Sequence, residues 1–88
     1  MMLVSVGMHT EGFERLVRAA DELAAGLAES VVIQYGCAQY EPQNAQAFRF
    51  TGSEEMNQYI QQARVVICHA GAGVLLLALK AKKKVIVV

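Results

Sequence analysis

Residues 68–73 are the part of this sequence best equipped for chemistry, and they read Cys-His-Ala-Gly-Ala-Gly. Glycine allows a ligand to approach the main chain, while free backbone N–H groups at a helix start, together with the helix dipole, attract anions. An imidazole beside them can donate a hydrogen bond to a phosphate oxygen. The segment therefore predicts a binding site for a phosphate, a diphosphate or a carboxylate, provided that a helix follows it.

The residues on both sides of this segment predict that helix and a strand before it. Four apolar or sulfur side chains, residues 65–68, are typical of a strand buried on both faces. A helix is expected from about Gly73 to Lys82, and residues 85–88 form a further apolar strand. Together these elements make a βαβ unit whose glycine turn lies at the tip of its first strand.

Strands and helices also alternate in the rest of the chain. Apolar residues three and four positions apart, from Phe13 to Leu27, predict a helix capped by Thr10, with Asp21 largely outside the apolar stripe. A second helix is expected to start near Ser53, which would be its cap. Other predicted elements are strands at residues 3–6, 31–34, 48–50 and 64–68 and a surface loop at 36–47. The alternation predicts an α/β fold, a Rossmann-like parallel sheet of about five strands with helices on both faces.

The composition is that of one small globular domain. The chain has 88 residues, 55% of them hydrophobic and only one proline, so it can fill a core. Eight Lys and Arg balance eight Asp and Glu, and this balance gives no attraction to nucleic acid. The local exception is a lysine cluster, Lys80 and residues 82–84. The helix dipole alone favours cations there, and binding of an anionic lipid or diphosphate is the alternative.

Cysteine usage and hydropathy indicate the compartment. Cys37 and Cys68 have no zinc-ligand spacing and are too few for a disulfide scaffold, so we predict no metal and two buried thiols, with a redox or nucleophilic role as the alternative. The N-terminus lacks the basic region of a secretory signal. The longest nearly apolar run, residues 65–79, is shorter than the roughly 20 residues that a membrane helix needs. A cytoplasmic location is expected.

The last strand and helix predict further contacts. A parallel strand of β-branched residues is normally covered on both faces, and nothing in the sequence follows Val88, so we expect a fragment of a longer protein. The apolar residues 74–79 cover more than one helical stripe. Part of that helix is expected to meet a missing segment, a partner chain or a second copy, the last giving a homodimer through the final helix or strand.

Several segments resemble the C-terminal domain of family 28 glycosyltransferases. These segments span nearly the whole chain, at residues 6–7, 13, 15–17, 33–36, 40–42, 54–56 and 67–73. The resemblance is closest to the small soluble catalytic subunits of two-component transferases in dolichol-linked N-acetylglucosamine transfer and bacterial polysaccharide synthesis. It implies the donor-binding half of a two-lobed enzyme that uses a UDP-sugar as substrate and no cofactor. The acceptor lobe would be a membrane-anchored partner, which would recruit this chain to the membrane face.

The same resemblance implies where the donor binds. The family's His-Ala-Gly-Ala-Gly loop, which matches residues 69–73, is implied to lie beside the donor diphosphate and sugar. The donor-binding residues predicted on this basis are Gly7, Gly71, Ala72, Gly73 and Val74.

Two histidines are the candidate catalytic residues. His69 is expected to donate a hydrogen bond to the donor phosphate, and a histidine satisfied by backbone at the strand end is the open alternative. His9 lies in the loop after the first predicted strand, where the matching family loop borders the cleft between the lobes. It is a candidate for contact with the acceptor or for general-base catalysis, and an ordinary loop histidine is the alternative.

The sequence departs from the family pattern at two places. After the glycine loop the family has Ser, two apolar residues and Glu, and Val74 and Leu77 occupy the Ser and Glu positions. The acidic residue is implied to hold the ribose hydroxyls, and a leucine cannot accept their hydrogen bonds. The family's Gly-Lys-Pro before the last strand appears as three lysines, residues 82–84, so the turn glycine is missing.

Three hypotheses follow from the sequence. The first is a glycosyltransferase subunit, inactive alone, that transfers a hexosyl or N-acetylhexosaminyl group to a lipid-linked acceptor. The second is a non-catalytic nucleotide-binding module, and the third is a self-associating structural fragment. A dehydrogenase is excluded because Leu76 stands where the third glycine of a Gly-x-Gly-x-x-Gly motif would lie.

Overall fold

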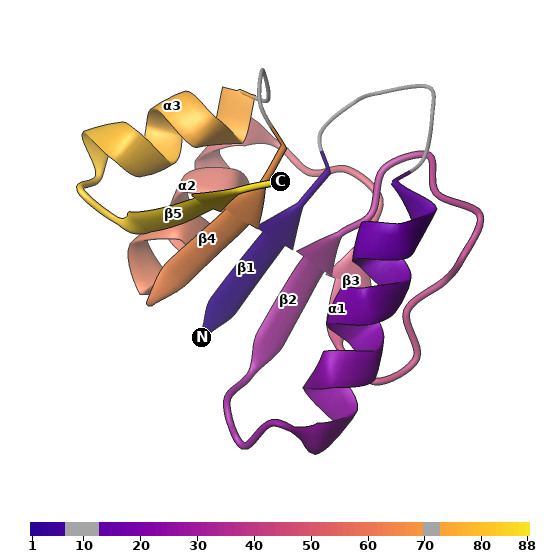
Figure 1. Cartoon of the computed structure of the whole chain (residues 1–88). Helices are drawn as coiled ribbons and strands as arrows, with labels where there is room; N and C mark the ends of the chain where they lie inside the picture. The colour runs from indigo at the N-terminus through magenta and orange to yellow at the C-terminus, as the bar shows by residue number, and fades with distance from the viewer. Residues whose placement is uncertain (7–12, 70–72) are drawn as a thin grey trace.

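The part of the chain described by the computed structural model, residues 1–6, 13–69 and 73–88, contains one five-stranded sheet. Every strand pair is parallel, and the strand order is β3-β2-β1-β4-β5 (Figure 1). The strands are β1 (Met2–Ser5), β2 (Val31–Gln34), β3 (Gln46–Phe48), β4 (Val65–Cys68) and β5 (Lys84–Val87). The predicted Rossmann-like parallel sheet is therefore confirmed.

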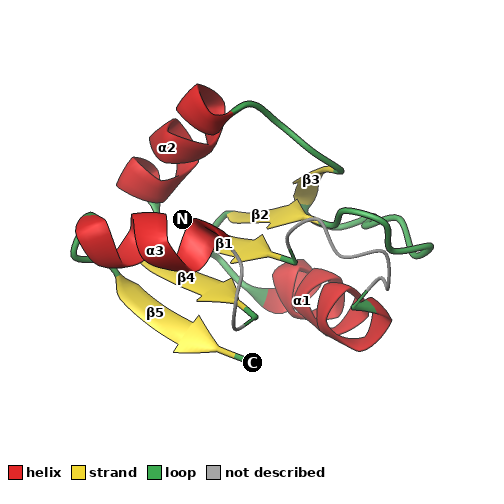
Figure 2. Cartoon of the chain, turned by 90° about the horizontal axis from the view of Figure 1, so that it is seen from above, coloured by secondary structure: helices red, strands yellow, loops and turns green. Residues whose placement is uncertain are grey.

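Helices cover both faces of this sheet, as predicted. They are α1 (Glu14–Gly26), α2 (Ser53–Gln62) and α3 (Gly73–Lys80). The first lies on one face, and the other two lie on the opposite face (Figure 2). Because successive strand residues point to opposite faces, two core clusters form. One packs Val4 of β1 against Val17 of α1, and the other packs Leu3 of β1 with Ile60 of α2.

Several predicted strand boundaries are wrong by one or two residues. The strand predicted at residues 48–50 lies at Gln46–Phe48, in register with Val32 to Gln34 of β2. This register half-buries Phe48 and leaves Phe50 50% exposed. The first and last strands each begin one residue earlier than predicted, and β4 begins one residue later. Hydrogen bonding to the neighbouring strand, which periodicity does not report, decides these ends.

Both helix starts differ from the predicted capping. Thr10, the predicted cap of α1, lies outside the described residues, and Phe13 occupies the N-cap position. Gly52 occupies that position in α2, with no side-chain cap, so the serine cap predicted at Ser53 is wrong. The Thr51 hydroxyl instead donates a 2.5 Å hydrogen bond to Glu55 in the first turn of α2.

A buried carboxylate holds the connection between β2 and β3, which contains no helix. Asp21 of α1 is fully buried and accepts hydrogen bonds from the Tyr40 hydroxyl at 2.5 Å and from the backbone N–H groups of Gln43, Asn44 and Ala45 at 2.8, 2.8 and 3.0 Å. Burial raises the pKa of Asp21, but these donors outweigh it and hold the pKa below its ordinary value. The expectation that Asp21 lies outside the buried stripe is therefore wrong.

The two cysteines lie in different environments. Cys68 of β4 is buried, and burial raises the pKa of its thiol. Cys37, in the β2–β3 connection, is exposed, so the prediction of a buried thiol is wrong there. The burial of Cys37 was predicted from residue type alone, whereas its observed exposure follows from its place in a surface loop.

Neither a metal-binding cluster nor a membrane-spanning helix is present in residues 1–6, 13–69 and 73–88. These residues contain no group of three His, Cys, Asp or Glu side chains placed to hold a metal ion. Among the same residues, no helix has the length and apolar character needed to cross a bilayer.

The turn after α3 explains how the chain accommodates lysine in place of the turn glycine. The N–H of Lys82 donates to Leu79 O and the N–H of Lys83 to Ala78 O, both at 3.0 Å, which is a Schellman motif. Lys82 has φ 58°, in the left-handed region that normally favours glycine. This conformation costs a lysine about 1–2 kcal/mol.

We predict that Asp21→Ala lowers the free energy of unfolding by about 3 kcal/mol, because three backbone N–H groups and a hydroxyl lose a charged acceptor. Since the folded-state pKa lies below the ordinary value of 3.8, the stabilisation is full above that pH. It is lost as the pH falls through the folded-state value. Urea unfolding at neutral and at strongly acidic pH measures both effects.

Glu22→Ala is the matched control, since Glu22 is the exposed neighbour on the same helix. It should change the free energy of unfolding by less than about 0.5 kcal/mol. Equal effects of the two substitutions at neutral pH would show that Asp21 does not hold the connection.

We predict that Lys82→Gly raises the free energy of unfolding by about 1 kcal/mol, because glycine adopts the left-handed conformation without the side-chain clash. The matched control is Lys80→Gly, in the last turn of α3, which should lower it because glycine is a poor helix former. Urea unfolding of both variants tests the pair. A loss of stability in Lys82→Gly would contradict the turn geometry.

Candidate functional site

The carboxyl ends of the central strands meet at one edge of the sheet. The parallel register places Ser5 of β1 level with Gln34 of β2 and Cys68 of β4. His69 follows β4 directly, and α3 begins at Gly73. In open parallel sheets, ligands bind outside this edge. The structure therefore brings His69 and Gly73 to the edge where a ligand is expected.

Four of the predicted site residues lie outside the described part of the chain. They are Gly7, His9, Gly71 and Ala72. The described members of the predicted site are His69, Gly73 and Val74.

His69 is held in a fixed plane. Its side chain is buried, at 6% exposure, and its ring stacks on Phe13 with centroids 4.5 Å apart and an interplanar angle of 18°. Phe13 is the N-cap residue of α1, so the stack joins the end of β4 to the start of that helix. Stacking of this kind fixes where the two ring nitrogens of His69 can donate or accept.

The start of α3 combines an exposed glycine with a buried valine. Gly73 is exposed, and a Cβ added there would meet no atom within 4 Å apart from its chain neighbours and its own helix backbone, so the space beside it is open. Val74 is buried in the core cluster that also contains Ala78, and Leu77 packs against that cluster. The side chain of Val74 therefore packs inside the protein, so a ligand at this helix start would meet main-chain N–H groups.

A buried polar pair ties the strands together at this edge. The Ser5 hydroxyl donates to Gln34 Oε1 at 2.6 Å, and Gln34 Nε2 donates to the carbonyl of Arg49 at 2.7 Å. Both side chains are buried. The bonds join β1, β2 and the residue that follows β3, so they fix the relative positions of three strand ends.

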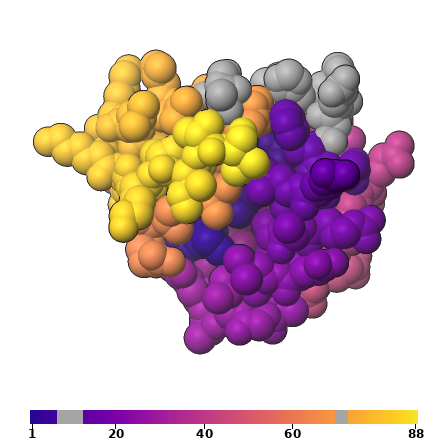
Figure 3. Space-filling view, viewed as in Figure 1, coloured from indigo at the N-terminus to yellow at the C-terminus, as the bar shows by residue number. Residues whose placement is uncertain are grey.

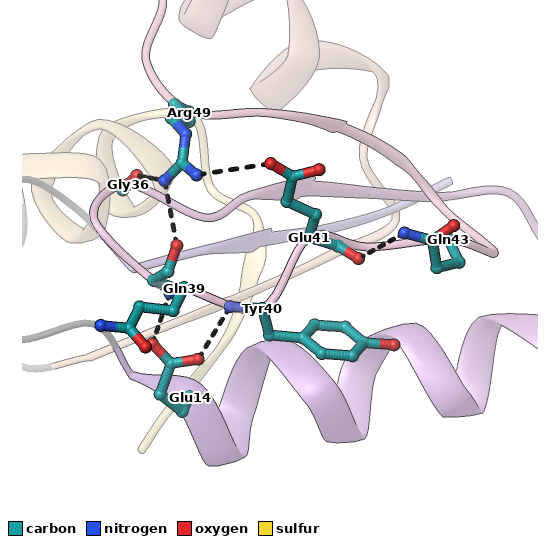
Figure 4. Close-up of polar contacts among 8 residues, drawn as sticks. Glu14, Gly36, Gln39, Tyr40, Glu41, Gln43 and Arg49 are labelled. Carbon is teal, nitrogen blue, oxygen red and sulfur yellow. Dashed lines mark hydrogen bonds and ion pairs between the residues drawn. The ribbon is translucent and has the colours of Figure 1, made fainter.

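The β2–β3 connection is fastened to α1 beside this edge (Figure 4). Glu14, in the first turn of α1, accepts hydrogen bonds from the backbone N–H groups of Gln39 at 2.6 Å and Tyr40 at 3.0 Å. These two bonds, that of Gln39 first, hold the pKa of Glu14 below its ordinary value. The carboxylate therefore stays charged at neutral pH and keeps this part of the loop against the helix.

Arg49 fastens the same connection from its other side (Figure 4). Its Nη1 donates to the carbonyl oxygens of Gly36 and Ala38, both at 2.9 Å, and its Nη2 lies 3.8 Å from Glu41. The guanidinium also lies 4.7 Å from the ring centroid of Tyr35. Gly36 has φ 54°, a conformation that glycine adopts without strain. These contacts of Arg49 hold the β2–β3 connection in its observed path.

The sequence did not predict the residues that hold the β2–β3 connection and the ring of His69. Glu14 and Asp21 are seven positions apart, which places them on one face of a helix, and that spacing was the signal available. No local pattern indicates that Arg49 caps carbonyl groups 11 and 13 positions earlier, or that Phe13 stacks on His69. These contacts depend on which strands are neighbours.

Comparison with known proteins assigns the chain to a family. No curated protein and no solved structure matches the chain. The family model of the glycosyltransferase family 28 C-terminal domain matches residues 1–88. Since the match extends over the whole sequence, the chain belongs to glycosyltransferase family 28, as the C-terminal domain that binds the nucleotide sugar.

Proposed function

We propose that this chain binds a UDP-sugar as the donor half of a transferase that passes a hexosyl or N-acetylhexosaminyl group to a lipid-linked acceptor. The observation that carries the proposal is the position of His69 and the start of α3 at the same edge of the sheet. A membrane-anchored partner subunit would supply the acceptor lobe. The chain alone would then bind donor without turnover.

The proposed chemistry breaks the bond between the anomeric carbon and the diphosphate oxygen. The acceptor hydroxyl forms the new bond at that carbon, and negative charge moves onto the leaving diphosphate. Main-chain N–H groups around Gly73 and Val74, with the dipole of α3, stabilise that charge. His69 donates a hydrogen bond to the same diphosphate. A base takes the acceptor proton, and His9, which lies outside the described residues, is our candidate.

A second candidate function, nucleotide binding without transfer, is favoured by the packing of α3. Leu77 packs against the core at the position where the family pattern has an acidic residue, and Val74 is buried where it has serine. Neither side chain can hydrogen-bond a ribose or a phosphate.

The expected homodimer through α3 or β5 stays a prediction, which a measurement of the molecular mass in solution would test.

We predict that UDP-N-acetylglucosamine and UDP shift the amide NMR signals of His69, Gly73 and Val74, because the ligand diphosphate lies against these groups. NAD, the comparison ligand, should not shift them. A two-dimensional amide titration measures this directly. A well-dispersed spectrum that responds to none of the UDP compounds would remove the donor-binding proposal for this chain.

We predict that Leu77→Glu lowers the dissociation constant for UDP at least about tenfold, because a carboxylate there accepts hydrogen bonds from the ribose hydroxyls. Leu76→Glu is the matched control, since Leu76 is the exposed neighbour on α3 and should leave UDP binding unchanged. The same NMR titration gives both constants, and the dispersion of each spectrum shows that the variant is folded. Equal responses of the two variants would contradict the proposed ribose contact.

A further inference from the structure

The zero net charge of this protein conceals a strong separation of charge along the chain. All eight acidic residues precede Met56, and five of the eight basic residues follow it. One of the five, Arg64, is neutralised by two hydrogen bonds to Glu29, at 2.9 and 2.7 Å. The other four are Lys80, Lys82, Lys83 and Lys84.

These four lysines are not neutralised within the described part of the protein. No acidic side chain there forms an ion pair with any of them. Lys83 Nζ donates to the carbonyl of Gln61 at 2.8 Å, which places the cluster beside the end of α2. The acidic residues of that helix, Glu54 and Glu55, are in its first turn, roughly 9 Å or more away along the axis. The cluster therefore keeps its positive potential.

The helix that leads into this cluster also exposes two leucines. Leu76 and Leu79 are each 58% exposed, whereas Val74 and Ala78 face the core. Residues three and four positions apart share a helix face, so Leu76, Leu79 and Lys80 lie together on the outer side of α3. In the space-filling view, the orange-to-yellow residues of α3 and β5 gather on one side of the molecule (Figure 3). We call this set, Leu76, Leu79, Lys80 and Lys82, the leucine–lysine surface; Lys84 is excluded because its register with Val65 turns it toward the α1 face of the sheet.

We propose that the leucine–lysine surface docks this protein onto an anionic lipid bilayer. Exposed leucines bordered by lysines suit the boundary between acyl chains and headgroups, where lysine stems lie along apolar atoms and their ammonium groups reach phosphate. A convex helix face offers no groove for a peptide, whereas a bilayer accepts protruding side chains. The charge complementarity selects anionic lipid. Because α3 has only eight residues, this docking is weak and reversible.

This surface is separate from the candidate donor site, and the proposal does not rest on sugar transfer. The helix α3 starts at the edge that carries His69, and the lysines follow its other end. A protein docked in this way would leave the carboxyl edge of the sheet open to ligand. Failure of UDP binding would therefore leave the docking proposal standing, and the reverse holds as well.

Vesicle flotation with the whole chain tests the proposal. We expect the protein to float with vesicles of equal parts phosphatidylcholine and phosphatidylglycerol but not with pure phosphatidylcholine, and the binding should weaken as salt rises. Lys80→Gln with Lys82→Gln should lower the partition coefficient about 30-fold. The control with the same loss of charge, Arg15→Gln with Arg18→Gln on α1, should leave it unchanged.

A second pair of variants tests the leucines. Leu76→Ser with Leu79→Ser should lower the partition coefficient, whereas Leu23→Ser with Leu27→Ser, at exposed positions on or just after α1, should not. Equal losses in the test and control variants would overturn the proposal. So would a two-copy mass in solution that Leu76→Ser with Leu79→Ser abolishes, because a second copy would then cover the surface. Amide spectra confirm that each variant is folded.

Discussion

The fully buried carboxylate of Asp21 holds the connection between β2 and β3, which contains no helix. Parallel strands need a long crossover connection, and the chain between β2 and β3 makes that crossover as a loop. Buried backbone N–H groups in such a loop must find acceptors. Asp21 provides them for residues 43–45, and Glu14 provides them for residues 39 and 40. The path of this connection, which leads into the edge strand β3, depends on these two side chains of α1.

The same helix also orders the candidate site. Its N-cap residue, Phe13, stacks on His69, and its first turn holds the loop that Arg49 fastens from the other side. The helix α1 thus contacts both the end of β4 and the β2–β3 connection. Rigid placement matters for a diphosphate site, because backbone donors stabilise a leaving group only when they are already aimed at it.

The two ends of α3 offer different chemistry. Its start presents main-chain N–H groups at the carboxyl edge of the sheet, whereas its end leads into lysines that no described acidic residue pairs with. On its inner face Val74 is buried in the core, and half-buried Leu77 packs against the margin of the same cluster. The inner side chains of α3 thus serve packing, so a ligand at its start would meet main-chain N–H groups.

The sequence by itself determined the α/β class, the parallel sheet, helices on both faces and the glycine segment, because hydrophobic periodicity and glycine spacing are local properties. Tertiary structure alone decided the burial of Asp21, the exposure of Cys37, the register of β3 and the stack of Phe13 on His69. Each depends on partners distant in sequence, brought together by strand order. The left-handed turn at Lys82 belongs with them, since the Schellman bonds impose it on a residue that does not favour it.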